Sequence, residues 1–242
     1  MKKLSIIIPC YNEAENLPYL IQKLEKISFD GLEIILVNNG STDSTNEVFS
    51  EEKKKRNLGI RLLIIKKNIG YGHGIMEGVL KASGEYIAWT HADLQTDPSD
   101  VVKAYENLKK TKLGLNSVIK GRRVRRNYFD TFFTLSMSII ASFIMGVKLS
   151  DINAQPKIFH KSFRTKLKNY PMDFSLDLFF LYQARINGYS LIEFPVSFKH
   201  RRFGESKGGG TLKGKWSLIK RTFKYMINLK QSIRSRNGNY NS

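Results

Sequence analysis

Three potential metal ligands stand at alternate positions near the middle of the chain. His91, Asp93 and Gln95 follow an apolar run, residues 86–89, which we interpret as a buried strand. Divalent cations in nucleotide sites are commonly shared between one or two carboxylates and substrate phosphate oxygens. We therefore predict that these side chains hold a metal ion that bridges the phosphates of a nucleotide.

The same stretch has a simpler interpretation as a polar turn leading into a helix. Asp97 can cap the first N–H groups of that helix, and Pro98 suits its first position. The helix-cap interpretation suits Asp97 and Pro98, at the end of the turn. For His91, Asp93 and Gln95 we favour the metal-binding interpretation.

Composition limits the class of protein. A chain of 242 residues can form one α/β domain with a C-terminal extension, and a net charge of +19 favours an anionic partner: nucleic acid, an acidic membrane surface or a phosphorylated substrate. The single cysteine, Cys10, excludes an internal disulfide. With neither a signal-peptide pattern nor eighteen uninterrupted apolar residues, we expect a cytoplasmic protein without a transmembrane helix.

Strand and helix patterns alternate along the first half of the chain. Apolar runs at residues 4–10, 33–38, 61–66 and 86–89 are separated by segments with helical character. Such alternation predicts a mostly parallel sheet with helices on both faces. Ligands bind outside the carboxyl ends of strands in such sheets, and that edge is where the predicted metal ligands fall.

A glycine-rich turn, N-I-G-Y-G-H-G at residues 68–74, precedes one of these helices. It resembles a phosphate-binding loop, but it lacks the G-x-G-x-x-G spacing and the lysine of a phosphate loop. Contact with a ligand and a purely structural turn both remain open.

Two segments have the composition of membrane-surface helices. Residues 129–147 are apolar and follow the basic run K-G-R-R-V-R-R, which suits a helix in the membrane interface or an ordinary core helix. Residues 212–236 contain no acidic residue and have apolar side chains at three- and four-residue spacing, a basic amphipathic pattern suited to an anionic bilayer. The alternative is that this stripe packs on the core. We assign residues 1–210 to the catalytic domain and 211–242 to this helix and a disordered polar tail.

Several motifs occur in a characteristic order: L-S-I-I-I-P-C-Y-N-E-A-E-N-L, V-N-N-G-S-T-D-S-T, N-I-G-Y-G-H-G and H-A-D-L-Q-T-D-P. Together they resemble the family-2 glycosyltransferases, which have the Rossmann-like GT-A fold. Three later segments, G-R-R-V-R-R, L-S-D-I-N-A-Q-P-K-I-F and F-P-V-S-F-K-H-R-R-F-G-E-S-K, are similar to the dolichyl- or polyprenyl-phosphate sugar synthases. The resemblance covers residues 4–210.

The resemblance implies a donor site at the ends of the first strands. The residues that it assigns to the nucleotide-sugar donor, besides Asp93 and Gln95, are Pro9, Tyr11, Glu13, Asn38, Asn39, Arg202 and Lys207. The family usually has aspartates where this chain has Asn38 and Asn39, so the choice of base can differ. Arg202 and Lys207 belong to a loop that is expected to close over the diphosphate.

His91 stands where the family has the first aspartate of D-x-D. Imidazole suits transition metals better than magnesium, so we expect Mn²⁺ to be preferred over Mg²⁺, with Asp93 as the essential ligand. The alternative is that His91 only hydrogen-bonds the diphosphate.

The resemblance also implies an acceptor site. Arg122 and Arg126 are expected to bind the acceptor phosphate through their planar guanidinium groups, Arg122 also at the transferring centre. Asp151 matches a family aspartate and is the best candidate base if the acceptor is a hydroxyl. Gln155 and Lys157 replace the usual residues of the next motif, so they can face an altered pocket.

These observations predict an inverting glycosyltransferase. It would move a sugar from a nucleotide-sugar donor to a polyisoprenyl phosphate at the cytoplasmic membrane face, held there by its own helices or by a membrane partner subunit. An acceptor hydroxyl on a glycan or lipid is the alternative substrate. A non-catalytic relative and a basic nucleic-acid-binding protein are the alternatives of another class, but no nucleic-acid-binding motif is present and we expect no nucleic-acid partner.

Overall fold

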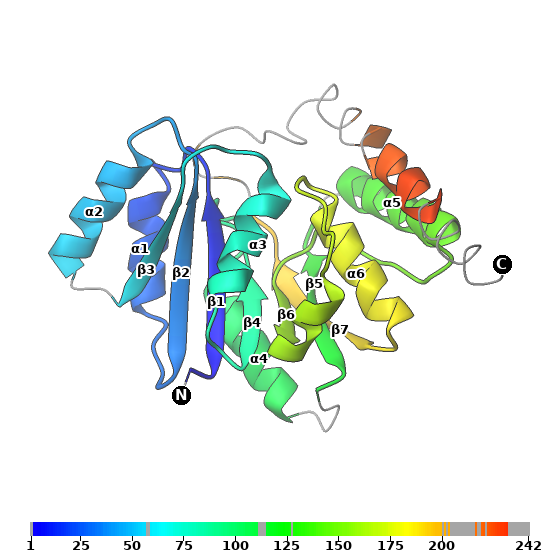
Figure 1. Ribbon diagram of the computed structural model, residues 1–242, viewed down its shortest axis with the longest axis horizontal. Helices are drawn as coiled ribbons and strands as arrows, with labels where there is room; N and C mark the ends of the chain where they lie inside the picture. Colours follow the sequence, from blue (N-terminus) through cyan, green and yellow to red (C-terminus); the bar gives the residue numbers. More distant parts are fainter. Residues whose placement is uncertain are drawn as a thin grey trace.

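A computed structural model describes residues 2–56, 59–110, 115–126, 128–199, 201, 203, 216, 219–220 and 222–231. Within these residues the chain forms one seven-stranded sheet with helices on both sides (Figure 1). The strands are β1 (Leu4–Cys10), β2 (Leu32–Asn39), β3 (Ile60–Ile65), β4 (Tyr86–Trp89), β5 (Ser117–Val124), β6 (Lys157–His160) and β7 (Ser190–Ser197). The helices are α1 (Leu17–Glu25), α2 (Thr45–Arg56), α3 (Tyr71–Lys81), α4 (Ser99–Lys110), α5 (Tyr128–Met145), the 3₁₀ helix η1 (Lys161–Lys166) and α6 (Leu176–Ile186).

The strand order is β3-β2-β1-β4-β6-β5-β7. Only β6 runs antiparallel to its neighbours, β4 and β5, while the other pairs are parallel. The carboxyl ends of β1, β2, β4, β5 and β7 therefore meet at one edge of the sheet, together with the amino end of β6. The predicted mostly parallel α/β sheet is confirmed.

Side chains alternate between the two faces of the strands and build two hydrophobic layers. On one face, Ile6 and Ala88 pack against α1, α2 and α4. On the other, Ile7 and Trp89 pack against α3, α6 and the inner side of α5. The central strands are buried on both faces, which is why their sequences are almost continuously apolar.

The turn after β4 ends at α4 as predicted. The Asp97 carboxylate accepts a hydrogen bond from the backbone N–H of Ser99 at 3.0 Å and forms an ion pair with Lys23 of α1. Partial burial opposes ionisation, but the Lys23 and Ser99 contacts outweigh it and lower the pKa of Asp97 to about 2.

Asp97→Asn is expected to lower the free energy of unfolding by about 1 kcal/mol at pH 7, after allowance for the partly exposed position of the pair. Because the folded-state pKa lies below the ordinary value of 3.8, this stabilisation is complete above that value and is lost as pH falls through about 2. Urea titrations at pH 7 and pH 2 would measure the loss of stability and its disappearance in acid. Asp30→Asn, at a pair whose carboxylate is almost fully exposed, is the control and should have no effect. An equal fall in the free energy of unfolding for both variants would contradict a stabilising role of the Asp97–Lys23 pair.

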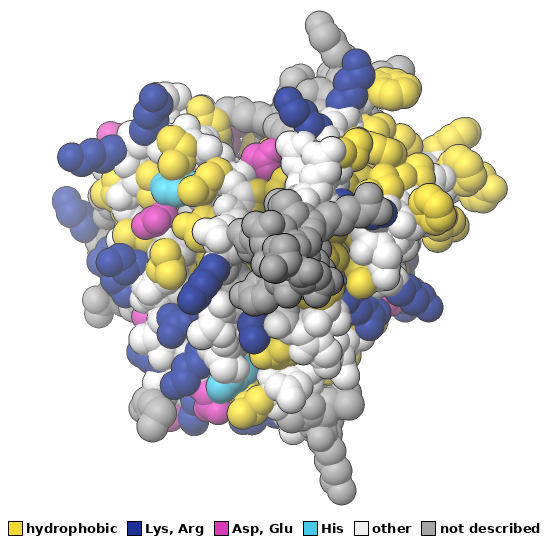
Figure 2. Space-filling model, turned by 45° about the vertical axis from the view of Figure 1, so that its right-hand side comes forward, with side chains coloured by type: hydrophobic (Ala, Val, Ile, Leu, Met, Phe, Trp, Pro, Cys, Tyr) yellow, Lys and Arg dark blue, Asp and Glu magenta, His cyan; other side chains and the backbone are white. Residues whose placement is uncertain are grey.

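Helix α5 lies at the far side of the sheet from α2 and presents a largely apolar outer surface (Figures 1 and 2). Its inner residues Ser138, Ala141 and Met145 are buried. Within the described residues, α5 is the one helix long and apolar enough to cross a membrane by length and composition. We expected no such helix, because serines and threonines interrupt the apolar run. They do not make the helix polar overall, so it still has the length and composition of a membrane span.

Residues 222–231 form a helix beside α5 (Figure 1). Met226 is fully buried in the same hydrophobic layer, and Phe223 and Leu229 pack against that layer. Trp216 and Ile227 are exposed. The predicted apolar stripe is therefore divided between the core and the surface, as far as its residues are described. Residues 211–215, 217–218, 221 and 232–242, which include the predicted polar tail, lie outside the described residues.

Candidate active site

Asp93 lies just beyond the carboxyl end of β4, where its side chain is 4% exposed. One carboxylate oxygen accepts the backbone N–H of Gln95 at 3.1 Å, and the other receives the Arg201 guanidinium at 2.8 Å. A buried carboxylate is costly unless it is paired, and the arginine supplies the missing positive charge. The second oxygen thus faces a place that already holds a cationic group.

Arg201 belongs to the segment that follows β7, of which residues 198, 199, 201 and 203 are described, and we call these four residues the β7 strap. Gln95 binds it at two points: its side-chain N–H group donates to the Lys199 carbonyl at 3.2 Å, and its side-chain oxygen accepts from Arg201 Nε at 3.3 Å. Further along, the Phe203 ring stacks on Tyr19 with centroids 5.7 Å apart. The strap therefore joins β7 to α1 over the turn that carries Asp93.

His91 is half-buried beside Asp93, and its ring stacks on Tyr71 of α3 with centroids 5.7 Å apart. Tyr71 stacks in turn on Phe174, at 4.8 Å. Burial lowers the pKa of His91 below its ordinary value, although Asp93 and Asp177 act in the opposite direction. The imidazole is therefore neutral at pH 7 and has a lone pair available for a metal or a hydrogen bond.

A buried polar network lies beneath His91. Asp177 accepts hydrogen bonds from Tyr71 at 3.2 Å, Trp89 at 3.4 Å and Gln155 at 2.9 Å, and it pairs with Lys157 at 3.4 Å. Burial lowers the pKa of Lys157 to about 8. Gln155 and Lys157 were predicted to face a pocket; both are almost fully buried here and orient Asp177.

Glu13, which follows β1, is the second carboxylate at this edge. Burial raises its pKa, and repulsion from Asp93 adds to the increase, while a 2.6 Å hydrogen bond from Asn16 opposes it. The Glu13 backbone N–H donates to the hydroxyl of Thr45 at 3.0 Å, so the first residue of α2 holds the loop after β1. Pro9 and Tyr11 lie in the same stretch at the end of β1.

Asn38 and Asn39, at the carboxyl end of β2, are almost fully buried. The Asn38 oxygen accepts the backbone N–H of Ser41 at 3.0 Å, and the Asn39 amide nitrogen donates to the Gly70 carbonyl at 3.0 Å. An aspartate at position 39 would place a carboxylate against that carbonyl. The amide is therefore the residue type that this packing requires.

The glycines of the turn at residues 68–74 are explained by close backbone packing. A Cβ atom on Gly70 would collide with the Met172 carbonyl, and one on Gly72 with the Pro171 carbonyl. The His73 backbone N–H also donates to the Met172 carbonyl, at 3.0 Å. These contacts account for the glycine pattern without a bound phosphate.

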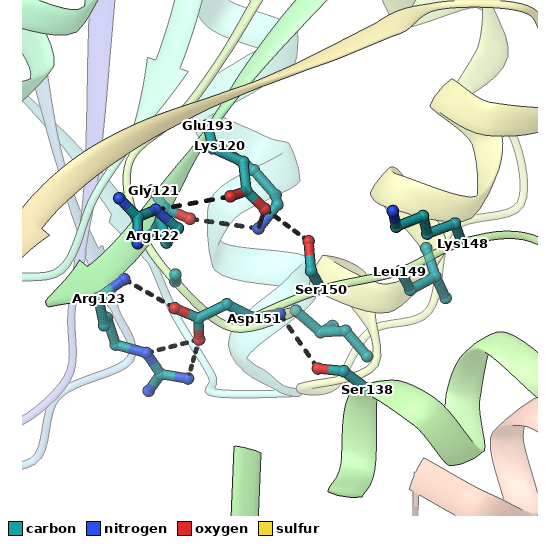
Figure 3. A network of polar contacts seen from close by, with 12 residues as sticks. Lys120, Gly121, Arg122, Arg123, Ser138, Lys148, Leu149, Ser150, Asp151 and Glu193 are labelled. Carbon is teal, nitrogen blue, oxygen red and sulfur yellow. Dashed lines mark hydrogen bonds and ion pairs between the residues drawn. The ribbon is translucent and has the colours of Figure 1, made fainter. Parts of the chain in front are cut away.

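An arginine cluster lies at the carboxyl end of β5, on the same edge of the sheet (Figure 3). The Arg123 guanidinium donates from two nitrogens to one carboxylate oxygen of Asp151, and the other oxygen accepts the Arg123 backbone N–H at 2.7 Å. Arg122 is half-exposed and lies 3.6 Å from Glu193. Arg126 donates to the hydroxyl of Thr134 at 2.7 Å. Arg123 and Arg126 both lie over the ring of Phe198, at 5.3 and 5.5 Å.

Asp151 has a depressed pKa in this arrangement. Burial alone would raise it, but the charge and hydrogen bonds of Arg123 outweigh burial and hold it below the ordinary value. A carboxylate that is ionised this readily is a weak base at neutral pH.

The described residues of the predicted site lie at one edge of the sheet. Those at the ends of β1, β2 and β4 form one side of the site, and the arginine cluster forms the other. Arg202 and Lys207 lie outside the described residues. Sequence reasoning missed Arg201, Arg123 and Tyr71. No local pattern separates Arg201 from the adjacent Arg202, and the contact of Arg201 with Asp93 follows only from the path of the chain after β7.

Comparison with known proteins identifies the family. The sequence model of glycosyl transferase family 2 matches residues 5–186. The chain belongs to this family. This confirms the predicted membership, and the sheet described above is its GT-A fold.

Family-2 relatives include curated and solved proteins. An undecaprenyl-phosphate 4-deoxy-4-formamido-L-arabinose transferase of Salmonella choleraesuis (strain SC-B67) is 29% identical over 216 residues, which cover 86% of this chain and 63% of that protein. A homologue of the same name from Salmonella paratyphi B (strain ATCC BAA-1250 / SPB7) is 28% identical over 215 residues, with the same coverage of both chains. The chain thus spans less than two thirds of the length of these relatives.

Two solved structures share the fold of this chain. Glucosyl-3-phosphoglycerate synthase of Mycobacterium tuberculosis, solved with Mn²⁺, UDP and glucosyl-3-phosphoglycerate, has a TM-score of 0.71 at 15% identity and covers 95% of this chain and 80% of its own. A mannosyltransferase of Pyrobaculum calidifontis, solved with GDP-mannose and Mn²⁺, has a TM-score of 0.63 at 18% identity and covers 84% of this chain and 58% of its own.

Proposed function

We propose that this family-2 protein is an inverting glycosyltransferase that moves a sugar from a nucleotide-sugar donor to a polyisoprenyl phosphate at the cytoplasmic face of a membrane. The observation that carries the proposal is the arrangement at one sheet edge: a buried carboxylate, Asp93, on one side and the arginine cluster beside the apolar helix α5 on the other. The Salmonella relatives, named for an undecaprenyl-phosphate acceptor, support the same acceptor class.

The donor side uses residues at the ends of β1, β2 and β4. Pro9, Tyr11 and Glu13 would contact the base and ribose, with Asn38 and Asn39 at the base, and Arg201 would join Arg202 and Lys207 near the diphosphate. For the described residues this assignment is supported by their common position at the carboxyl edge of the sheet, where nucleotides bind in such folds. Arg202 and Lys207, which lie outside the described residues, are assigned from the family resemblance.

A divalent metal fits the same edge. Asp93 already opposes a cationic group, and His91 is a neutral imidazole, so these two residues would hold the ion and the donor phosphates would complete its coordination. Gln95 is a third candidate, although its side chain binds the β7 strap here. The metal would neutralise charge on the leaving diphosphate. The mannosyltransferase and the synthase were both solved with Mn²⁺ bound, and an imidazole ligand favours Mn²⁺ over Mg²⁺.

The acceptor side favours a phosphate over a hydroxyl. A hydroxyl acceptor needs a base, and Asp151, the candidate, is ion-paired with Arg123 and has a lowered pKa. A phosphate acceptor is largely ionised at pH 7 and needs no base. Arg122 and Arg126 would bind it, because guanidinium groups match phosphate oxygens in geometry and charge.

Transfer to a lipid phosphate can be tested directly. Purified protein, Mn²⁺ and a panel of labelled nucleotide sugars would be incubated with a short polyprenyl phosphate, and with the corresponding polyprenol as the matched hydroxyl control. The expected result is organic-soluble label with the phosphate alone. Label on the polyprenol would favour the hydroxyl alternative, and no label with any donor would favour a non-catalytic relative.

We further propose that α5 rests on the membrane surface. Both of its ends stay on the domain, since Arg126 before the helix and Leu149 after it bond to helix residues Thr134 and Ser142. These contacts hold α5 against the domain, which favours a position along the bilayer surface over a crossing. Its outer side chains, such as Phe129 and Phe143 at 83% and 87% exposed, suit the interface instead.

Vesicle flotation tests this placement. The double variant F132S/F143S is expected to lose most binding to anionic vesicles at low salt, because both rings are exposed on α5. Ile64→Ser, at an exposed apolar site on the opposite end of the sheet, is the control and should float like the wild type. If the wild type ignores anionic vesicles at low ionic strength, docking through a membrane partner subunit becomes the better explanation.

A further inference from the structure

Helix α5 carries two different stripes. Its exposed side has Phe132, Leu135, Ile139 and Phe143, while Thr134, Ser138 and Ser142 recur every four residues and therefore share another side of the helix. We call these three residues the hydroxyl stripe. Each of its members bonds to a segment that leads to or from the arginine cluster.

Ser138 is the centre of the hydroxyl stripe and is 5% exposed. Its hydroxyl donates to the Thr134 carbonyl at 2.8 Å and accepts the backbone N–H of Asp151 at 3.1 Å (Figure 3). Asp151 has a φ of 39°, in the left-handed region that residues with a side chain rarely adopt. Such a backbone persists only where its surroundings fix it, and the Ser138 hydroxyl is one of the groups that do so.

Ser142 fixes the residue two positions before Asp151. Its hydroxyl accepts the Leu149 backbone N–H at 2.9 Å and lies 3.1 Å from the Leu149 carbonyl. The loop after α5 is therefore attached to the helix at both Leu149 and Asp151. Asp151 in turn binds Arg123 through both carboxylate oxygens.

Thr134 binds Arg126, the second arginine of the cluster that α5 contacts. Its hydroxyl accepts a hydrogen bond from Arg126 at 2.7 Å. Arg126 and Arg123 lie over the same ring, Phe198, so the two guanidinium groups are held on one aromatic platform. The hydroxyl stripe thus determines the position of one arginine directly and of the other through Asp151.

We propose that Ser138 and Thr134 are positioning residues for the acceptor phosphate. They do not bind the phosphate. Thr134 sets the position of Arg126, and Ser138, through Asp151 and Arg123, sets the end of β5 that carries Arg122. A site made of two guanidinium groups loses affinity when their spacing is wrong. This inference rests on the proposed lipid-phosphate acceptor. It gives α5 a second role, since the helix proposed to contact the bilayer also orients the groups that receive the lipid's headgroup.

The test compares two serines of the same helix. Ser138→Ala removes the hydroxyl that binds the Asp151 backbone, whereas Ser136→Ala removes an exposed hydroxyl that bonds only to the Phe132 carbonyl of its own helix. Initial rates with a short polyprenyl phosphate would give KM for acceptor and donor. S138A is expected to raise the acceptor KM about tenfold and to leave the donor KM within about twofold, as one lost buried hydrogen bond predicts. S136A should match the wild type.

Two further variants separate positioning from folding. Ser138→Thr retains the hydroxyl and should restore an acceptor KM near that of the wild type, and Thr134→Val should raise the acceptor KM as S138A does. A loss of S138A activity that affects both substrates equally and parallels a fall in Tm would overturn the inference. So would an active wild type with S138A indistinguishable from S136A. A wild type that transfers nothing to the lipid phosphate would overturn the proposed function itself.

Discussion

Asp93→Asn is expected to lower the rate of sugar transfer about 10³-fold, the largest effect of any substitution considered for this site. The amide keeps the size of the side chain and can still accept the Gln95 N–H, but it loses the negative charge that faces Arg201. A metal bound to donor phosphates would lose its protein carboxylate, and the removal of one preorganised charged group typically costs this much. Steady-state rates at saturating Mn²⁺ would measure it.

The control is Asp100→Asn, the same substitution on helix α4, where the carboxylate pairs only with Lys103 among the described contacts. It should leave turnover unchanged. A second comparison, His91→Asp, should keep transfer active and improve the use of Mg²⁺ relative to Mn²⁺, because a carboxylate is the harder ligand. Full activity of the wild type in a chelator, or of D93N in any metal, would remove the metal from the mechanism.

Arg123→Met is expected to lower the free energy of unfolding by about 3–5 kcal/mol, because it leaves the carboxylate of Asp151 in a largely buried place without its partner. The double variant R123M/D151N should be more stable than R123M, since the uncompensated charge is then absent. Urea unfolding of the wild type, R123M, D151N and R123M/D151N would complete the double-mutant cycle.

Arg122→Met is the matched control for this cycle. Arg122 is 53% exposed and its pair with Glu193 is longer, 3.6 Å, so its loss should cost at most about 1 kcal/mol. If R123M and R122M unfold at the same urea concentration, the Arg123–Asp151 pair contributes little and Asp151 is free to act in another way.

The fold could be predicted because its signals are local. Strands such as Leu4–Cys10 and Leu32–Asn39 are mostly apolar, and the polar turns after them hold the capping and turn residues that end each element. Asp97 was recognisable as a helix cap for the same reason. The edge at which Asp93, Asn38 and Glu13 meet follows from strand direction alone, because parallel strands bring their carboxyl ends together.

The contacts of these residues depended on the tertiary structure. Two adjacent arginines follow β7, and nothing local says which of them reaches Asp93; the direction of the β7 strap places Arg201 there. The glycines near Tyr71 resemble a phosphate-binding loop in sequence, but the 171–173 backbone that packs against them explains why Gly70 and Gly72 have no side chain. Each of these contacts joins residues that lie about a hundred positions apart in the sequence.

The α/β class, the family motifs, the carboxyl edge that carries them and the basic, apolar character of the second half of the chain can all be recognised in the sequence. The pairing of the buried charges cannot, because it depends on how the chain packs: Asp93 with Arg201, Asp151 with Arg123, and Asp177 with Lys157. The physical reason is range. Periodicity and turn chemistry act between neighbours along the chain, whereas the pairing of buried charges is set by which strand ends and loops the packed core brings together.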